Sequence, residues 1–102
     1  MAKKSIIWSN RAEVELKSTL NFYNLRNGNT KYSFKLLKQV NKVLDNLSEN
    51  EFMGRLTEDK KTRVVVMGVY LIFYEIISFE IRIMSFWDNR QKPEKRIDSI
   101  KQ

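Results

Sequence analysis

Hydrophobic residues between positions 30 and 47 recur every three or four residues, as they do on the buried face of an amphipathic helix. These positions are Leu36, Leu37, Val40, Val43, Leu44 and Leu47. Four lysines use the same spacing on the opposite side of that helix: Lys31, Lys35, Lys38 and Lys42. The lysine stripe is typical of a solvated helix face, and it would also suit the binding of phosphate groups.

A second helix is predicted over residues 10–27. One face of it collects Ala12, Leu16, Thr19, Leu20 and Tyr23. Ser9 or Asn10 is a suitable N-cap, and Asn27-Gly28-Asn29 supplies residues that accept a left-handed helix end. Because the connection to the other predicted helix is short, we expect the two helices to form an antiparallel hairpin.

Four further segments are rich in Val, Ile, Phe and Tyr and have the length of strands: residues 4–8, 63–67, 70–76 and 80–87. Gly68 and Ser78 mark the reversals between the last three, which are predicted to form an antiparallel meander. The predicted fold is therefore α+β, with the element order β-α-α-β-β-β. Its antiparallel sheet carries the helical hairpin on one face.

The chain has 102 residues and contains neither cysteine nor histidine, which excludes disulfides, thiol nucleophiles and imidazole acid–base chemistry. We expect one domain over residues 1–93 and a polar C-terminal tail over residues 94–102. There is no glycine-rich phosphate loop and no converging set of carboxylates, so neither a cofactor nor a metal site is predicted. The apolar stretches are too short for a signal peptide or a membrane span, and a cytoplasmic location is expected.

A net charge of +7 favours an anionic partner, such as nucleic acid, an anionic membrane surface or an acidic protein. Four arginines lie in or next to the predicted strands: Arg55, Arg63, Arg82 and Arg90. They could form an anion-binding patch on the sheet face away from the helices, or they could protect the sheet from aggregation. Val14, Phe22 and Leu25 lie off the core face of the first helix and are either partner contacts or ordinary exposed apolar residues.

The order and spacing of several motifs resemble the RelE/ParE superfamily, the toxins of type II toxin–antitoxin modules. The similarity covers roughly residues 5–93. It includes Trp8-Ser9 before the first helix, Met53-Gly54-Arg55, the strand-rich stretch over residues 63–74, and the segment that runs from Arg90 to Pro93.

The superfamily contains two activities: RelE-like members cleave mRNA on the ribosome, and ParE-like members bind DNA gyrase. RelE-like nucleases often carry a basic residue directly after the tyrosine that begins the middle strand, where this chain has Leu71. The ParE pattern near the end usually reads His-x-Arg-Arg-x-Pro, and here Asp88 and Gln91 replace the His and the second Arg. The resemblance favours the ParE-like branch.

That branch implies a plasmid-stabilisation toxin that binds DNA gyrase and forms a hetero-oligomer with an acidic cognate antitoxin. The implied target-binding residues are Trp87, Asp88, Arg90 and Arg55. The implied antitoxin-binding residues are Val14, Phe22 and Leu25. One alternative is a metal-independent endoribonuclease that acts on ribosome-bound mRNA through Arg55, Arg63, Arg82, Arg90 and Tyr70. The other alternative is a non-toxic, small basic binding module.

Overall fold

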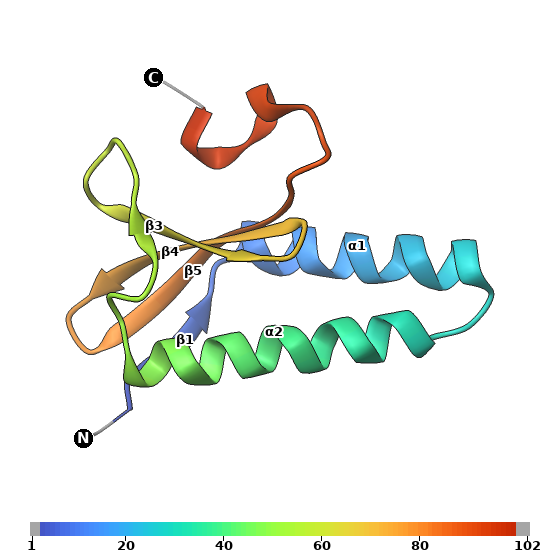
Figure 1. Ribbon diagram of the computed structural model, residues 1–102, viewed down its shortest axis with the longest axis horizontal. Coiled ribbons are helices and arrows are strands. Elements are labelled where there is room, and N and C mark those ends of the chain that lie inside the picture. Colours follow the sequence, from blue (N-terminus) through green and yellow to red (C-terminus); the bar gives the residue numbers. More distant parts are fainter. Residues whose placement is uncertain (1–2, 100–102) are drawn as a thin grey trace.

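The two predicted helices form an antiparallel hairpin in the computed structural model, which describes residues 3–99 (Figure 1). Helix α1 spans Asn10–Asn27 and α2 spans Lys31–Glu49, close to the predicted bounds. Ser9 caps α1, because its hydroxyl oxygen accepts a hydrogen bond from the Ala12 amide at 3.1 Å. Gly28 ends α1 with a left-handed φ of 71°, which glycine adopts without steric cost.

Five strands form one sheet in the order β1-β5-β4-β3-β2. Their bounds are Ser5–Trp8 for β1, Arg55–Leu56 for β2, Thr62–Met67 for β3, Tyr70–Ile77 for β4 and Glu80–Asp88 for β5. The last three strands form the predicted antiparallel meander, with reversals at Gly68 and Ser78, whose φ angles are 62° and 51°. The α+β class and the order of the long elements are confirmed.

The pairing of β1 differs from the predicted antiparallel arrangement, because β1 lies parallel to β5 and makes the sheet mixed. The junction between β1 and α1 explains this direction. Ser9 donates its backbone N–H to the Ile83 carbonyl at 2.9 Å and its hydroxyl to the Met84 carbonyl at 3.2 Å. As a result, β1 and then the start of α1 run along the same edge of β5, the edge that β4 does not pair with. The two-residue strand β2 is absent from the prediction because so short a segment has no alternation to detect.

The helices cover one face of the sheet and enclose the main core (Figure 1). Leu36, Val40 and Leu47 of α2 pack there with Ile72 and Ile81 of the sheet, and all five are buried. The predicted apolar face of α2 is therefore confirmed. The four lysines of the stripe are all exposed.

The opposite face of the sheet carries a smaller apolar cluster, formed by Val64, Leu71, Phe73 and Trp87 with Met84 and Ile97 packed on it. Ile97 comes from the C-terminal segment, where Pro93–Lys95 and Ile97–Ser99 form two short 3-10 turns (Figure 1). The segment expected to be a polar tail thus supplies an apolar contact to the sheet. Residues 100–102 of that tail lie outside the described residues.

Candidate partner-binding groove

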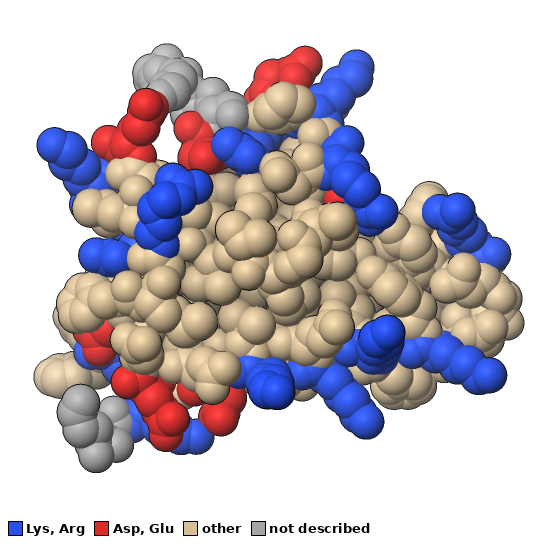
Figure 2. Space-filling view, in the orientation of Figure 1, with Lys and Arg blue, Asp and Glu red and all other residues tan. Residues whose placement is uncertain are grey.

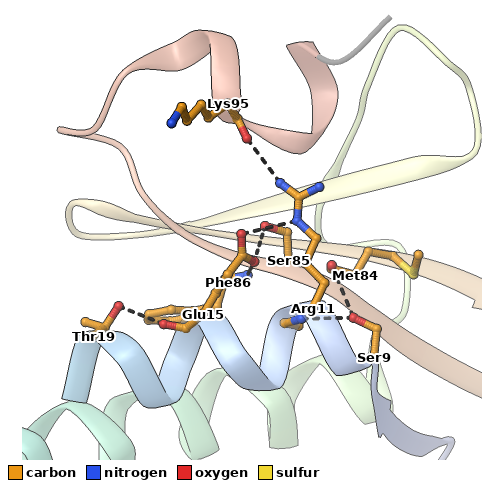
Figure 3. A network of polar contacts seen from close by, with 9 residues as sticks. Ser9, Arg11, Glu15, Thr19, Met84, Ser85, Phe86 and Lys95 are labelled. Atoms are coloured by element: carbon orange, nitrogen blue, oxygen red, sulfur yellow. Dashed lines mark hydrogen bonds and ion pairs between the residues drawn. The ribbon is translucent and has the colours of Figure 1, made fainter. Parts of the chain in front are cut away.

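The carboxylate of Glu15 ties α1 to the part of the β5 edge that β1 does not cover (Figure 3). Its Oε1 accepts hydrogen bonds from the Ser85 hydroxyl at 2.7 Å and from the Phe86 backbone amide at 3.0 Å. Its Oε2 accepts one from Arg11 Nε at 3.2 Å, and Arg11 Nη2 donates to the Lys95 carbonyl at 3.1 Å. Glu15 thereby satisfies a backbone donor that an unpaired strand edge would leave open.

A column of aromatic side chains connects the two helices to the sheet. Its members are Phe22, Tyr23, Tyr32, Tyr70 and Phe86. The ring centroids lie 4.9 Å apart for Phe22 and Tyr23, and 4.6 Å apart for Tyr23 and Tyr32. Tyr70 and Phe86 stack at 5.0 Å, and the hydroxyl oxygens of Tyr32 and Tyr70 are 2.8 Å apart. Because each contact constrains the next ring, this aromatic column fixes the helical hairpin against the sheet.

Arg90 lies just beyond β5 and binds the α1 end of the aromatic column. Its Nε and Nη2 donate to the two carboxylate oxygens of Asp88 at 2.9 and 2.7 Å, and Nη2 also donates to the Tyr23 hydroxyl at 2.8 Å. Hydrogen bonding to the guanidinium lowers the pKa of Asp88, and the carboxylate raises the pKa of Arg90. Asp88 is therefore ionised at neutral pH and holds Arg90 against α1.

A groove of about 440 Å³ lies between α1 and the C-terminal end of β5, and we call it the α1–β5 groove. Val14 and Phe22 line it and are 53% and 56% exposed, and Asp88 lines it too. Two of the three apolar residues named from the sequence thus meet at one site. The third, Leu25, is 77% exposed and does not line this groove.

Trp87 also lines the groove, but its side chain is only 6% exposed because it packs in the second apolar cluster with Leu71 and Phe73. The Trp87 side chain therefore offers little surface to a target, and its place among the implied target-binding residues stays a prediction. Its indole Nε1–H is a buried donor with no acceptor among the described residues.

The four arginines near the sheet do not form the anion-binding patch that the sequence suggests. Arg63 is in register with Tyr74 on the side that the helices cover, and its Nη1 donates to the Gly54 carbonyl at 2.8 Å. Arg82 alternates to the opposite face, and its Nη2 donates to Glu80 at 3.2 Å.

The other two arginines are exposed, and they stand apart because β2 and β5 are not neighbours in the sheet. Arg55 belongs to the edge strand β2, and its side chain has no hydrogen-bond or ion-pair partner within residues 3–99. Arg90 lies against α1, where Asp88 and Tyr23 bind it. Side chains alternate between the two faces of a sheet, which separates Arg63 from Arg82. Arg55 and Arg90 are separated because they lie on or next to strands that are not neighbours.

Tyr70, a residue of the nuclease alternative, is poorly suited to act as a base. It is 3% exposed and its hydroxyl is paired with that of Tyr32. Burial, reinforced by that hydrogen bond, raises the pKa of Tyr70 above its ordinary value. A general base working near neutral pH needs the opposite shift.

Glu15 and Tyr32 build the site, although neither residue is predicted to do so from the sequence. For Glu15 the available signal is its i,i+4 spacing from Arg11, which by itself indicates an ordinary surface ion pair. For Tyr32 the sequence offers no such signal, because the role of Tyr32 depends on β4 residues that lie far along the chain.

The chain has a small α+β fold, in which a helical hairpin packs on one face of a five-stranded mixed sheet. It matches a solved structure described as a chromosomal ParDE toxin–antitoxin system from P. aeruginosa, with a TM-score of 0.70 and 18% sequence identity. The match covers 82% of this chain and 94% of that chain, and it establishes the RelE/ParE-like fold. The family described as the ParE toxin of the type II toxin–antitoxin system parDE matches residues 6–93. The chain therefore belongs to the ParE toxin family, which confirms the resemblance.

A search of curated proteins finds no match to this sequence. Within the described part of the chain, no helix has the length and apolar character needed to cross a membrane.

Proposed function

We propose that this type II toxin arrests growth in the cytoplasm by binding DNA gyrase and that it leaves mRNA uncut. The observation that carries the proposal is the state of Tyr70, whose hydroxyl is bound to Tyr32 and whose pKa is raised. Since the chain has no histidine, Tyr70 is a leading candidate for a proton acceptor, and its environment opposes that role. The dispersed arginines also provide no convergent cations for a pentavalent phosphate.

Arg90 is the residue we expect to contribute most to target binding. Its side chain is 56% exposed, and Asp88 fixes the direction of its guanidinium. A charged donor that is already oriented loses less conformational entropy on binding, so its hydrogen bonds contribute more to affinity. Asp88 acts in this scheme as a positioning residue, and Arg55 supplies a second exposed cation.

We expect a cognate antitoxin to neutralise the toxin by forming a hetero-oligomer with it. Val14 and Phe22 in the α1–β5 groove, with Leu25 farther along α1, offer apolar anchors to such a partner. Exposed apolar side chains gathered at an open groove are typical of protein-binding sites.

The target is tested by inducing the toxin in cells, with a supercoiling assay on purified gyrase and primer extension on ribosome-bound transcripts. We expect inhibited supercoiling and intact mRNA. Arg90→Ala should weaken both toxicity and gyrase inhibition. Arg82→Ala is the matched control, because Arg82 likewise pairs with an acid two residues earlier. Codon-dependent cuts with normal supercoiling would replace the proposal with a ribosome-dependent ribonuclease, and absence of growth arrest would indicate a non-toxic binding module.

The antitoxin site is tested by isothermal titration of purified antitoxin into the toxin. Phe22→Asp should weaken binding, because it replaces an apolar anchor of the groove with a charge. Phe79→Asp is the control, since Phe79 is also exposed but precedes the opposite end of β5. Equal affinities for the two variants would remove the α1–β5 groove from the interface.

A further inference from the structure

A second groove, of about 420 Å³, lies between α2 and the turn that joins β3 to β4. Its walls are formed by Lys35, Gln39 and Lys42 of α2 and by Met67, Gly68 and Val69 of the hairpin. We call it the α2–hairpin groove. In Figure 2, Lys and Arg side chains follow the middle and right of the lower edge of the molecule, with Asp and Glu side chains at the left of that edge, beside a broad face without charged side chains.

The two lysines of this groove have no carboxylate partner within residues 3–99. They are seven residues apart, so they stand two helical turns, or about 10 Å, from each other along one wall. Lys3, by contrast, pairs with Asp45 at 2.7 Å. The α2–hairpin groove therefore presents uncompensated positive charge to whatever enters it.

The lining of the groove includes a pair of tyrosine hydroxyls as well. Tyr32 and Tyr70 line it, and their hydroxyl oxygens are 2.8 Å apart. That bond uses one of the two hydroxyl protons, and the other has no acceptor among the described residues. A carboxylate or carbonyl oxygen that enters the groove can accept it.

Apart from the Gln39 amide, the remaining lining of the groove is apolar, and it suits a protein segment better than a nucleic acid. Val69 is 41% exposed and Met67 is partly buried, so an apolar side chain can pack between the two lysines. Single-stranded nucleic acid gains much of its binding energy from bases stacked on free aromatic rings. Here the rings of Tyr32 and Tyr70 already pack against Tyr23 and Phe86 in the aromatic column.

We propose that the α2–hairpin groove binds an acidic segment of the antitoxin, with carboxylates beside Lys35 and Lys42 and an apolar side chain against Val69. This inference rests on the antitoxin partner proposed above. The two grooves lie on either side of the aromatic column, because Tyr23 and Phe86 line one and Tyr32 and Tyr70 line the other. One antitoxin chain can therefore occupy both by crossing the end of the sheet.

The test compares two charge-reversal double variants by isothermal titration with purified cognate antitoxin. Lys35→Glu/Lys42→Glu changes the groove. Lys31→Glu/Lys38→Glu is the matched control, with the same helix, the same seven-residue spacing and the same change in net charge, but neither residue lines the groove. We expect the groove variant to lose at least about tenfold more affinity than the control, because only it places like charges in contact. Circular dichroism confirms that both variants are folded.

Equal losses for both double variants would show a general attraction between net charges, which overturns the inference. If neither variant loses affinity while Phe22→Asp does, the antitoxin partner stands but the α2–hairpin groove is not its site. If the unaltered toxin binds no antitoxin, the proposed function fails and the inference fails with it. If oligouridylate displaces the antitoxin from the unaltered toxin and from the control but not from the groove variant, the groove is a nucleic-acid site and the inference is again overturned.

Discussion

Tyr74 holds the loop before β2 through the backbone of Gly54. Its hydroxyl oxygen accepts a hydrogen bond from the Gly54 amide at 2.9 Å, and the hydroxyl donates to the Glu51 carbonyl at 2.7 Å. Arg63 completes the attachment by donating to the Gly54 carbonyl at 2.8 Å. Both backbone groups of Gly54 are thus satisfied by side chains of β3 and β4, so this loop depends on two side chains from neighbouring strands.

Tyr74→Phe should lower the free energy of unfolding by about 1–3 kcal/mol, because it leaves a buried amide and a carbonyl without their partner. The packing of the ring is retained, so the variant should remain folded. Urea denaturation measures the change. Tyr23→Phe is the control, since its hydroxyl is bound by Arg90 in an exposed position and its loss should cost less. Equal midpoints for the Tyr74 variant and the unaltered protein would show that the Gly54 contact contributes nothing.

Gly54→Ala should destabilise the protein through a steric clash. A Cβ at Gly54 would lie 2.7 Å from both Cε1 and the hydroxyl oxygen of Tyr74 and 3.0 Å from the Val64 carbonyl. Crowding of this kind typically costs about 1–3 kcal/mol, and here it also displaces the Tyr74 hydroxyl from its partners. Gly68→Ala is the comparison, because a Cβ added at Gly68 would have nothing within 4 Å. Only the positive φ of Gly68 opposes alanine. Thermal melting should rank Gly54→Ala below Gly68→Ala, and the reverse order would contradict this account.

Much of the fold follows from local sequence patterns. The spacing of Leu36, Val40 and Leu47 defines the buried face of α2, and Gly28 and Gly68 mark positions where the chain must adopt a positive φ. These features depend on residues close together in the chain. The parallel pairing of β1 is different, because it depends on contacts between Ser9 and a strand more than 70 residues later.

The candidate site is less predictable for the same reason. Val14 and Phe22 stand out because they break the pattern of their own helix, and both line the α1–β5 groove. The exposure of Trp87 cannot be judged from its strand alone, since Ile97 packs on its cluster from a segment that reads as polar. Glu15 looks like an ordinary surface residue until its partner on β5 is known.

Acid should weaken the protein through Asp59. Its carboxylate accepts hydrogen bonds from the backbone amides of Thr62 and Lys61 at 2.8 Å each and from the Thr62 hydroxyl at 2.7 Å. These bonds lower the pKa of Asp59 well below its ordinary value, with the Thr62 amide as the largest cause. A carboxylate whose pKa is lowered in the folded state stabilises the protein above its unfolded pKa of about 4, and that contribution is lost as the pH falls through the folded pKa.

Asp59→Asn should therefore be less stable than the unaltered protein at pH 7, and the difference should narrow as the pH falls below about 4. Melting temperatures at pH 7, 4 and 3 measure the difference. Asp45→Asn is the control, because Asp45 lies on the surface and pairs with the exposed Lys3. A difference that stays constant down to pH 3 would mean that the charge of Asp59 does not stabilise the turn.

Glu15→Ala should be the most disruptive of the exchanges on the surface of α1. It removes the acceptor for the Phe86 amide and the Ser85 hydroxyl, and it leaves Arg11 without its acid. Hydrogen bonds to a charged group contribute about 1.5–3 kcal/mol each, so we expect a loss of at least about 2 kcal/mol. Glu13→Ala, on an exposed position of the same turn, should cost within about 0.5 kcal/mol.

A second readout separates a role at the sheet edge from simple loss of charge. Once Glu15 is removed, the Phe86 amide faces an unpaired edge of β5, which favours strand-to-strand association. Size-exclusion chromatography should therefore detect self-association of Glu15→Ala at concentrations where Glu13→Ala is monomeric. Glu15→Gln keeps an acceptor oxygen for the Phe86 amide and should remain monomeric, although it loses the ion pair with Arg11. If Glu15→Gln self-associates as strongly as Glu15→Ala, the negative charge, and not the acceptor for the strand edge, is what keeps the chain from associating.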